Sequence, residues 1–227
     1  MNASYQSIKL TYIMQGRLFE IDGVDNFTNT DFSSCGKVNE FKVLPCNRTG
    51  VVGFIEMWHY SENVNGLTTD ICFRLLDAKG RMIGAMIYGK ISMPDVWKKY
   101  ADKESDLIEL KRLCCIDNTP KNTESYFIGA TLRWLKKHTD FKRVISYADT
   151  TYGHEGTIYK ATNFDCVGMT APGKVIMYNG NRYHDKTIRT KYKGKLKPFA
   201  KEIKNALETG EATYVDTLGK HIFLYEL

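Results

Sequence analysis

Side chains that could carry out chemistry gather in four short stretches of this 227-residue chain. The first stretch is Trp58-His59-Tyr60-Ser61, which lies between two apolar regions. Histidine, tyrosine and serine can all transfer protons or bind a ligand, so this stretch is a candidate reactive element. The alternative is a loop whose aromatic rings pack and whose histidine is solvated, and the spacing by itself favours that alternative.

The second stretch joins an alternating segment, Glu109–Leu113, to a polar segment, Asp117–Ser125. A strand that leads into the beginning of a helix presents unpaired backbone N–H groups at the positive end of the helix dipole, which together can bind an anion. Arg112 and Lys121 could add positive charge there. A Walker loop and a glycine-rich turn are both absent, so the pattern alone is a weak indication of a phosphate site.

In the third stretch, residues 146–159, an apolar strand ends at an acidic residue, Asp149, and a Gly-His-Glu-Gly loop leads into a short helix. Ligand sites in open α/β sheets lie at the carboxyl ends of strands. Asp149 could therefore act as a base or a metal ligand, and His154 as a proton shuttle. The alternative, which the sequence leaves open, is that Asp149 caps a turn and His154 is a turn residue.

The fourth stretch, Thr190–Lys197, alternates lysines with other residues, including Tyr192. On a strand or extended ribbon the lysines would share one face and point toward phosphates, and Tyr192 could stack on bases or simply pack. The surrounding segment 182–204 holds nine basic and two acidic residues, although the whole chain has a net charge of only +6. We predict a polyanion-facing segment there, with a solvated basic face as the alternative.

The elements that must position these stretches follow from hydrophobic periodicity and turn residues. Strands are predicted at Asp70–Leu76, Arg81–Tyr88, Leu107–Cys115, Arg143–Ala148, Phe164–Met169 and His221–Leu227, and helices at Pro120–His138 (capped by Thr119) and Thr157–Thr162. Strands followed by alternating helices and strands indicate an α/β fold with a central mixed, mostly antiparallel sheet flanked by helices. We expect one domain over residues 1–227, in which residues 1–53 form part of the core or an added cap.

Composition narrows the class of protein further. No stretch approaches the roughly 20 apolar residues that a membrane-spanning helix needs, and the first residues do not resemble a secretory signal, so we expect a cytoplasmic protein without membrane association. The six cysteines form no CxxC pair, and no histidine pair has zinc-binding spacing. Buried free thiols are therefore expected rather than a structural zinc site.

In this order, the stretches resemble the bacteriophage Mom family of DNA-modification proteins. The resemblance extends from about Phe54 to Leu227 and rests on Trp58–Ser61, Glu109–Leu113 with Pro120–Ser125, Ser146–Asp149, and Gly153 to Phe164. It implies the GNAT fold of acetyl-CoA-dependent N-acyltransferases, in which a tyrosine on the helix that Tyr159 would occupy often lies near the thiol. It also implies that strands Leu107–Cys115 and Arg143–Ala148 are neighbours that separate at their carboxyl ends. The glycine-containing pyrophosphate loop of that superfamily is missing, and Asp117–Ser125 occupies its place.

The resemblance implies a transferase that adds a carbamoylmethyl (acetamido) group to adenine N6 in double-stranded DNA and protects phage DNA from host restriction. The implied catalytic residues are His59, Tyr60, Ser125, Asp149 and Tyr159. The implied donor, acetyl-CoA or a related acyl donor, would bind Arg112, Lys121, Asn122 and Ser125. The implied metal is iron, which could bind His59, Tyr60 and Asp149. The residues expected to contact DNA are Arg189, Lys191, Lys193, Lys195 and Lys197. A homodimer is compatible with this expectation. Two alternatives stay open: an N-acyltransferase acting on a protein or small amine, and a non-catalytic DNA-binding phage protein.

Overall fold

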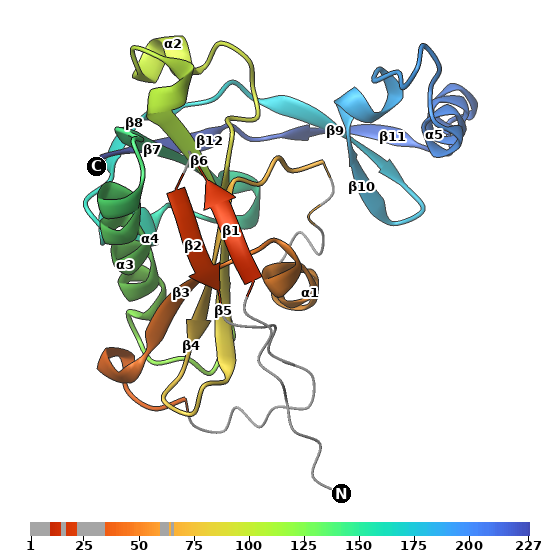
Figure 1. Cartoon of the computed structure of the whole chain (residues 1–227). Coiled ribbons are helices and arrows are strands. Elements are labelled where there is room, and N and C mark those ends of the chain that lie inside the picture. Colours follow the sequence, from red (N-terminus) through yellow and green to blue (C-terminus); the bar gives the residue numbers. More distant parts are fainter. Residues whose placement is uncertain (1–9, 15–16, 22–34, 60–63, 65) are drawn as a thin grey trace, which may run out of the picture. The chain divides into compact units, whose positions relative to one another are not determined.

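The computed structural model describes residues 10–14, 17–21, 35–59, 64 and 66–227, and the chain forms two compact units (Figure 1). The larger unit comprises Met1–Tyr147, Gly156–Cys166 and Phe223–Leu227. The smaller unit comprises Ala148–Glu155 and Val167–Ile222. The expectation of one domain over the whole chain stays a prediction, and each unit is described by itself.

The main sheet has seven strands in the order β3-β4-β5-β6-β7-β12-β8. Their bounds are β3 (Lys42–Cys46), β4 (Ile71–Leu76), β5 (Met82–Gly89), β6 (Leu107–Cys115), β7 (Arg143–Asp149), β8 (Asp165–Met169) and β12 (Lys220–Glu226). The pairs from β3 to β6 are antiparallel, whereas β6 and β7 are parallel. The predicted α/β fold with a mixed sheet is therefore confirmed, and β3, within segment 1–53, forms one edge of that sheet.

Helices α1 (Thr49–Trp58) and α3 (Thr123–His138) flank this sheet in Figure 1. Every residue of β4 and β5 is buried, which explains why these strands are almost continuously apolar. Helix α3 buries the predicted stripe of Ile128, Leu132 and Leu135. It begins at Thr123 rather than at Pro120, because the Pro120 carbonyl oxygen accepts hydrogen bonds from the Thr123 amide and hydroxyl in a preceding turn.

Short elements connect these strands and helices. They are β1 (Leu10–Met14), β2 (Arg17–Ile21), η1 (Val38–Glu40), α2 (Trp97–Tyr100), η2 (Glu104–Asp106), η3 (Thr150–Tyr152) and α4 (Thr157–Lys160). The predicted helix at Thr157–Thr162 is thus shorter at its end, and Asn163 has the positive φ of 62° expected of a residue that stops a helix. In the part of the chain that the structure describes, no helix has both the length and the apolar character needed to cross a membrane.

The smaller unit contains an antiparallel sheet in the order β10-β9-β11 and one longer helix. Its elements are β9 (Gly173–Tyr178), β10 (Asn181–His184), η4 (Asp185–Ile188), α5 (Pro198–Thr209) and β11 (Thr213–Thr217). Ile176 on β9 packs with Ile203, Ala206 and Ala212 in a small hydrophobic core. The basic segment 182–204 therefore belongs to a folded unit with apolar packing of its own.

Candidate active site

The parallel strands β6 and β7 pair over only part of their length. Their register runs from Leu107 opposite Arg143 to Leu110 opposite Ser146, although β6 continues to Cys115 and β7 to Asp149. On the other side of β6, the pairing with β5 passes from Leu110 to Arg112, so that Lys111 is the extra residue of a β-bulge. Bulges bend a strand and change where its side chains point, and they are frequent beside active sites. The predicted separation of these two strands is confirmed.

Two hydroxyl groups meet where the strands separate. Ser146 is completely buried, and its Oγ lies 3.0 Å from the Leu110 carbonyl oxygen and 2.8 Å from the Tyr159 hydroxyl. A serine has one hydroxyl hydrogen, so at any moment Ser146 donates either to the carbonyl oxygen or to the tyrosine. When Ser146 donates to Tyr159, the tyrosine directs its own hydrogen away from Ser146. The arrangement is a short path along which a proton can move.

The position of Tyr159 is fixed by close packing around α4. Gly156 precedes this helix with φ +72°, and a Cβ added there would lie 2.2 Å from the ring of Phe223. The Tyr159 ring packs 5.0 Å from the Phe223 ring and 5.5 Å from the Phe164 ring, measured between centroids. Only glycine therefore allows β12 to approach α4 closely enough to hold the tyrosine against Ser146.

A buried ion pair lies on β6, on the face of the sheet opposite the Ser146–Tyr159 pair. Glu109 and Lys111 lie 3.1 Å apart, with side chains 10% and 2% exposed. The Glu109 carboxylate also accepts hydrogen bonds from the Ser92 amide at 2.7 Å and the Ser92 hydroxyl at 3.0 Å. Burial, followed by the nearby charge of Glu109, raises the pKa of Tyr147. Because Tyr147 and Ser146 are consecutive on β7 and point to opposite faces, the ion pair and the Ser146–Tyr159 pair lie on opposite faces of the sheet.

The predicted anion site is at the beginning of α3. Asn122 adopts a left-handed conformation with φ 71° and its side chain does not cap the helix, and the Thr123 amide donates to the Pro120 carbonyl oxygen, so an anion there would bind the Glu124 and Ser125 amides. The Ser125 hydroxyl donates to the Asn122 carbonyl oxygen at 3.0 Å, so Ser125 closes the first turn. Lys121 is exposed, and the half-buried Arg112 donates to the Lys111 carbonyl oxygen at 2.7 Å.

Asp149, in the smaller unit, makes an ion pair and a local cap. Its Oδ2 lies 2.9 Å from Lys220 Nζ, and its Oδ1 accepts the Thr151 amide at 3.1 Å, which caps η3. Burial by itself would raise the pKa of Asp149, but the hydrogen bond and charge of Lys220, with the bonds to Thr151, lower this pKa below its usual value. The carboxylate is thus ionised at neutral pH and is a weak base.

The structure does not show the expected iron-binding residues as one set. His59 is buried at the end of α1, Tyr60 lies outside the described residues, and Asp149 belongs to the other compact unit. Across the described ranges, no three His, Cys, Asp or Glu residues lie close enough to hold a metal ion. Both Asp149 oxygens are engaged by Lys220 and Thr151, so the described side chains give no support for an iron site.

The thiols do not supply a nucleophile on β6. Burial raises the pKa of Cys114 to about 12 and also raises the pKa of Cys115. Both side chains are therefore protonated at neutral pH. All six cysteines are free, as predicted from their spacing, although Cys115 is only partly buried and Cys166 is exposed.

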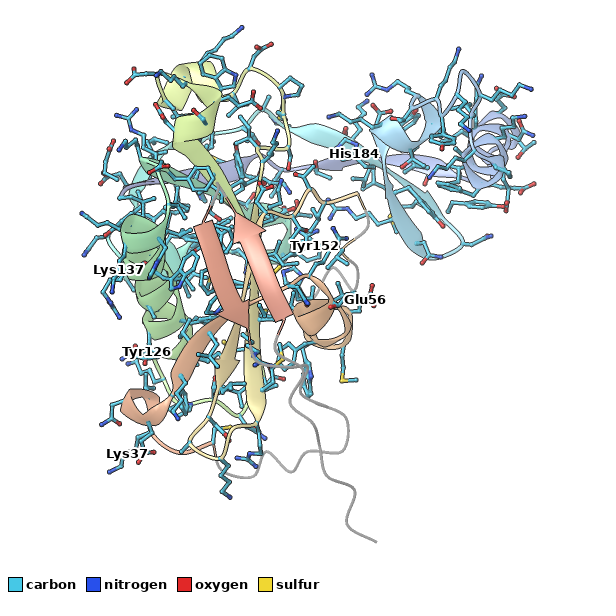
Figure 2. The ribbon with its side chains drawn as sticks, viewed as in Figure 1. Lys37, Glu56, Tyr126, Lys137, Tyr152 and His184 are labelled. Atoms are coloured by element: carbon cyan, nitrogen blue, oxygen red, sulfur yellow. The ribbon has the colours of Figure 1, made fainter. Side chains whose placement is uncertain are left out.

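The predicted DNA-contacting residues are all exposed and all belong to the smaller unit. These residues are Arg189, Lys191, Lys193, Lys195 and Lys197. The expectation of an extended ribbon is wrong, because Lys193 and Gly194 both have positive φ, of 49° and 78°, and reverse the chain. The lysines thus surround a tight turn instead of sharing one face of a strand. Nearby, His184 lies at the start of η4, and Tyr152 accepts a hydrogen bond from Arg182 at 2.7 Å (Figure 2).

Reasoning from the sequence missed Ser146, Glu109, Lys111 and Ser92 as candidate site residues. A signal was present for two of them, because Glu109 and Lys111 are charged residues spaced by two in an otherwise mostly apolar strand. Such a pair is expected to share one face and to be buried together. Of the predicted residues, His59, Arg112, Ser125 and Tyr159 lie in the larger unit and Asp149 in the smaller, so their convergence on one cleft stays a prediction.

Comparison with known proteins places this arrangement in a family. The chain is 26% identical over 116 residues to the methylcarbamoylase mom of Escherichia phage Mu, and the match spans 50% of this chain and 48% of that protein. The chain thus covers about half the length of this curated relative. Among solved structures, NAA60 of Arabidopsis thaliana in complex with acetyl-CoA is 13% identical over 82% of this chain and 98% of that chain, with a TM-score of 0.49. A GCN5-related N-acetyltransferase from Kribbella flavida is 8% identical over 84% and 100%, also with a TM-score of 0.49.

The model of the Mom protein family matches residues 40–227. This range contains the separated strands β6 and β7, the Ser146–Tyr159 pair and the whole smaller unit. The chain therefore belongs to the Mom protein family.

Proposed function

We propose that this protein is a phage DNA-modification transferase that attaches a carbamoylmethyl-type group to adenine N6 in double-stranded DNA and so protects that DNA from host restriction. The observation that carries the proposal is the family match across residues 40–227, which includes both the buried hydroxyl pair and the basic smaller unit. The name of the phage Mu relative supports a carbamoyl-containing product.

The donor in this proposal is acetyl-CoA or a related thioester. Its phosphates would bind the first-turn amides of α3, where helix dipole and unpaired N–H groups favour negative charge. Arg112 and Lys121 supply the positive side chains, and the turn closed by Asn122 and Ser125 holds the amides in place. The backbone of a non-glycine loop would thus take the place of a glycine-rich phosphate loop.

Tyr159 is the proposed proton donor to the departing thiolate. When an amine attacks a thioester carbonyl carbon, the C–S bond breaks and the sulfur leaves with a negative charge that a nearby acid can neutralise. While Ser146 donates to the Tyr159 hydroxyl oxygen at 2.8 Å, Tyr159 directs its own hydrogen to a different acceptor, which would be the thiolate sulfur in this step. Ser146 therefore positions Tyr159 and keeps its hydroxyl polarised.

Glu109 is the proposed base for the amine. The adenine amino group is a poor nucleophile because its lone pair is delocalised into the ring, so a base that accepts its proton during attack lowers the barrier. Glu109 lies on the sheet face opposite Tyr159, so that proton removal and proton donation would occur on the two sides of the reacting carbon. The adenine would first have to leave the base stack to reach any such site.

The product requires more than acyl transfer alone. Direct attack on a thioester joins N6 to a carbonyl carbon, whereas a carbamoylmethyl group is joined through its CH₂ carbon. The group therefore has to come from a related donor that supplies both the CH₂ carbon and the amide nitrogen, and not from an acetyl group already attached to N6.

Mass spectrometry of nucleosides from plasmid DNA, isolated after expression of the protein in a bacterium, tests the proposed function. A new adenosine derivative is expected with the wild-type protein and not with Tyr159→Phe. Unmodified adenosine together with intact coenzyme A binding would instead favour an acyltransferase of proteins or small amines. Unmodified adenosine with DNA binding and without thioester binding would favour a DNA-binding protein without catalytic activity.

A further inference from the structure

The basic segment contains a rigid two-residue turn with an aromatic side chain at its base. The Tyr192 amide donates to the Lys195 carbonyl oxygen at 2.8 Å, and the Lys195 amide donates back to Tyr192 at 3.1 Å. The two residues between them, Lys193 and Gly194, have φ of 49° and 78°, the positive values that the tightest hairpin turns require. The turn thus has a defined shape that does not depend on a partner.

Packing within the smaller unit does not account for Tyr192. Its side chain is 63% exposed, whereas Tyr178 and Tyr183 pack against the hydrophobic core of Ile176, Ile203, Ala206 and Ala212. Exposed aromatic rings are common at protein surfaces, so the exposure of Tyr192 becomes informative through the turn that holds it and the charges around it. The sequence left open whether Tyr192 packs or stacks, and the structure excludes packing in the core of its own unit.

The charge around this ring is almost entirely positive. Lys191, Lys193, Lys195 and Lys197 are all exposed, and Lys193 Nζ lies 5.6 Å from the centre of the Tyr192 ring. The two acidic residues of the segment have partners, since Asp185 pairs with Arg189 and Glu202 accepts a hydrogen bond from Tyr178 at 3.0 Å. An aromatic face among lysines matches the chemistry of a nucleotide, which has a flat base and an anionic backbone.

We propose that the turn Tyr192–Lys195 is a binding site for an unstacked DNA base, in which Tyr192 stacks on the base while the neighbouring lysines contact the flanking phosphates. The proposal rests on the proposed function only for the choice of DNA as the polyanion. It extends that function because a protein that removes adenine from the stack opens a gap in the duplex. A ring that stacks on the exposed bases would recover part of the energy lost by unstacking.

Titration of fluorescent duplexes tests this site directly. The probes are a fully paired duplex and the same duplex with one unpaired adenine, or with 2-aminopurine at that position. The wild-type protein should bind the unpaired probe more tightly and quench 2-aminopurine fluorescence. Tyr192→Ala should weaken binding of the unpaired probe by about 5- to 100-fold, as expected from loss of one base–aromatic stack. Binding to the paired duplex and its salt dependence should change little, because no charge is removed.

Two matched variants separate stacking from general effects. Tyr192→Trp keeps an aromatic face and should retain both the preference and the quenching. Tyr214→Ala is the control, because Tyr214 belongs to the same unit and is 48% exposed but lies on β11, two residues from Asp216. The Tyr214→Ala protein should bind both probes like the wild type. A Tyr192→Ala protein that retains the wild-type preference and quenching would overturn the proposal. Equal binding of an RNA probe with an unpaired adenine would overturn the assignment to DNA.

These outcomes are independent of the outcome for the proposed function. If the wild-type protein leaves adenosine unmodified but Tyr192→Ala still loses its preference for the unpaired probe, the base-binding site stands and the proposed function fails. If the wild-type protein modifies adenosine and Tyr192→Ala keeps its preference, the proposed function stands and the base-binding site fails.

Discussion

The hydroxyl oxygens of Ser146 and Tyr159 lie 2.8 Å apart in the interior of the larger unit, and Ser146 also contacts the Leu110 carbonyl oxygen, at the last pair of the parallel strands β6 and β7. The site where the strands separate is thus connected by hydrogen bonds to a tyrosine on α4. Buried hydroxyl groups are normally paired, so this path is present before any substrate binds. What this path and the groups around it contribute can be measured with single substitutions.

Tyr159→Phe should reduce the rate of adenosine modification by about 10²- to 10⁴-fold, the usual contribution of a general acid. The fold should persist, because the phenyl ring still packs against Phe164 and Phe223. Nucleoside mass spectrometry gives the rate, and thermal unfolding gives the stability. Tyr126→Phe is the matched control. This variant loses the hydrogen bond of 2.9 Å that the Tyr126 hydroxyl donates to the Phe41 carbonyl oxygen, and it should keep its activity. Wild-type activity in Tyr159→Phe would remove the tyrosine from the mechanism.

Glu109→Gln should lower the free energy of unfolding by about 3–5 kcal/mol, because Lys111 would keep a buried charge without an ionised partner. Adding Lys111→Met removes that charge and should return most of the stability, as measured by urea unfolding. If Glu109 accepts the proton of the amine, the double variant is folded but does not modify DNA. An active double variant would limit Glu109 to a structural role.

The Asp149–Lys220 ion pair should make stability depend on pH in the acidic range. Because the pKa of Asp149 is lower in the folded protein than its usual value of 3.8, the stabilisation is fully present above pH 3.8 and is lost as the pH falls through the folded pKa. Asp149→Asn should therefore be less stable than the wild type at neutral pH by about 1–2 kcal/mol and less sensitive to acid. Urea unfolding at a series of pH values measures both.

The same variant separates a structural from a catalytic role of Asp149. Lys220→Gln breaks the ion pair but retains the carboxylate, so its stability at neutral pH should fall by a similar amount. If Asp149 acts in catalysis, Asp149→Asn abolishes adenosine modification and Lys220→Gln reduces it less. Equal activities of the two variants would instead show that Asp149 serves only to hold the loop after β7.

Gly156→Ala should destabilise the larger unit by about 2 kcal/mol or more, because an added Cβ both clashes with Phe223 and requires a left-handed backbone. The clash would displace the Phe223 ring, which packs against Tyr159, so activity should fall together with stability. Gly153→Ala is the control: it has a similar φ of 73° but no atom within 4 Å of an added Cβ. Equal unfolding free energies for the two variants would show that the approach of Phe223 is unimportant.

Changing Lys191, Lys193, Lys195 and Lys197 to Gln should weaken duplex binding and flatten the plot of log affinity against log salt by up to about 3–4 units, since each phosphate contact contributes about 0.9. The modified base should stay the same, because phosphate contacts position a protein while base contacts give specificity. Fluorescence anisotropy across a salt series measures the slope. An unchanged slope would mean that this turn does not contact DNA.

Local patterns in the sequence were enough to determine most elements of the fold. The apolar runs at Asp70–Leu76 and Arg81–Tyr88 predicted buried strands, and the stripe of Ile128, Leu132 and Leu135 predicted the buried face of α3, because hydrophobic periodicity is a local property. The resemblance to a known family also identified Tyr159, and the local excess of positive charge identified the basic segment. Local chain reversals were predicted less accurately. Pro120 was expected to begin a helix that starts at Thr123, and the tight turn at Lys193 and Gly194 was not predicted.

Only the tertiary structure decided which side chains act on one another. Ser146 is an ordinary serine in the sequence, and its contact with Tyr159 depends on the close approach of Phe223 to Gly156, across 67 positions of the chain. Lys111 becomes the extra residue of a bulge only because β5 and β6 pair in one particular register. The sequence offered Asp149 as a base, a metal ligand or a turn cap, but it did not indicate Lys220, far along the chain, as the partner of its carboxylate. Such contacts depend on packing between distant segments, which hydrophobic pattern and local propensity do not specify.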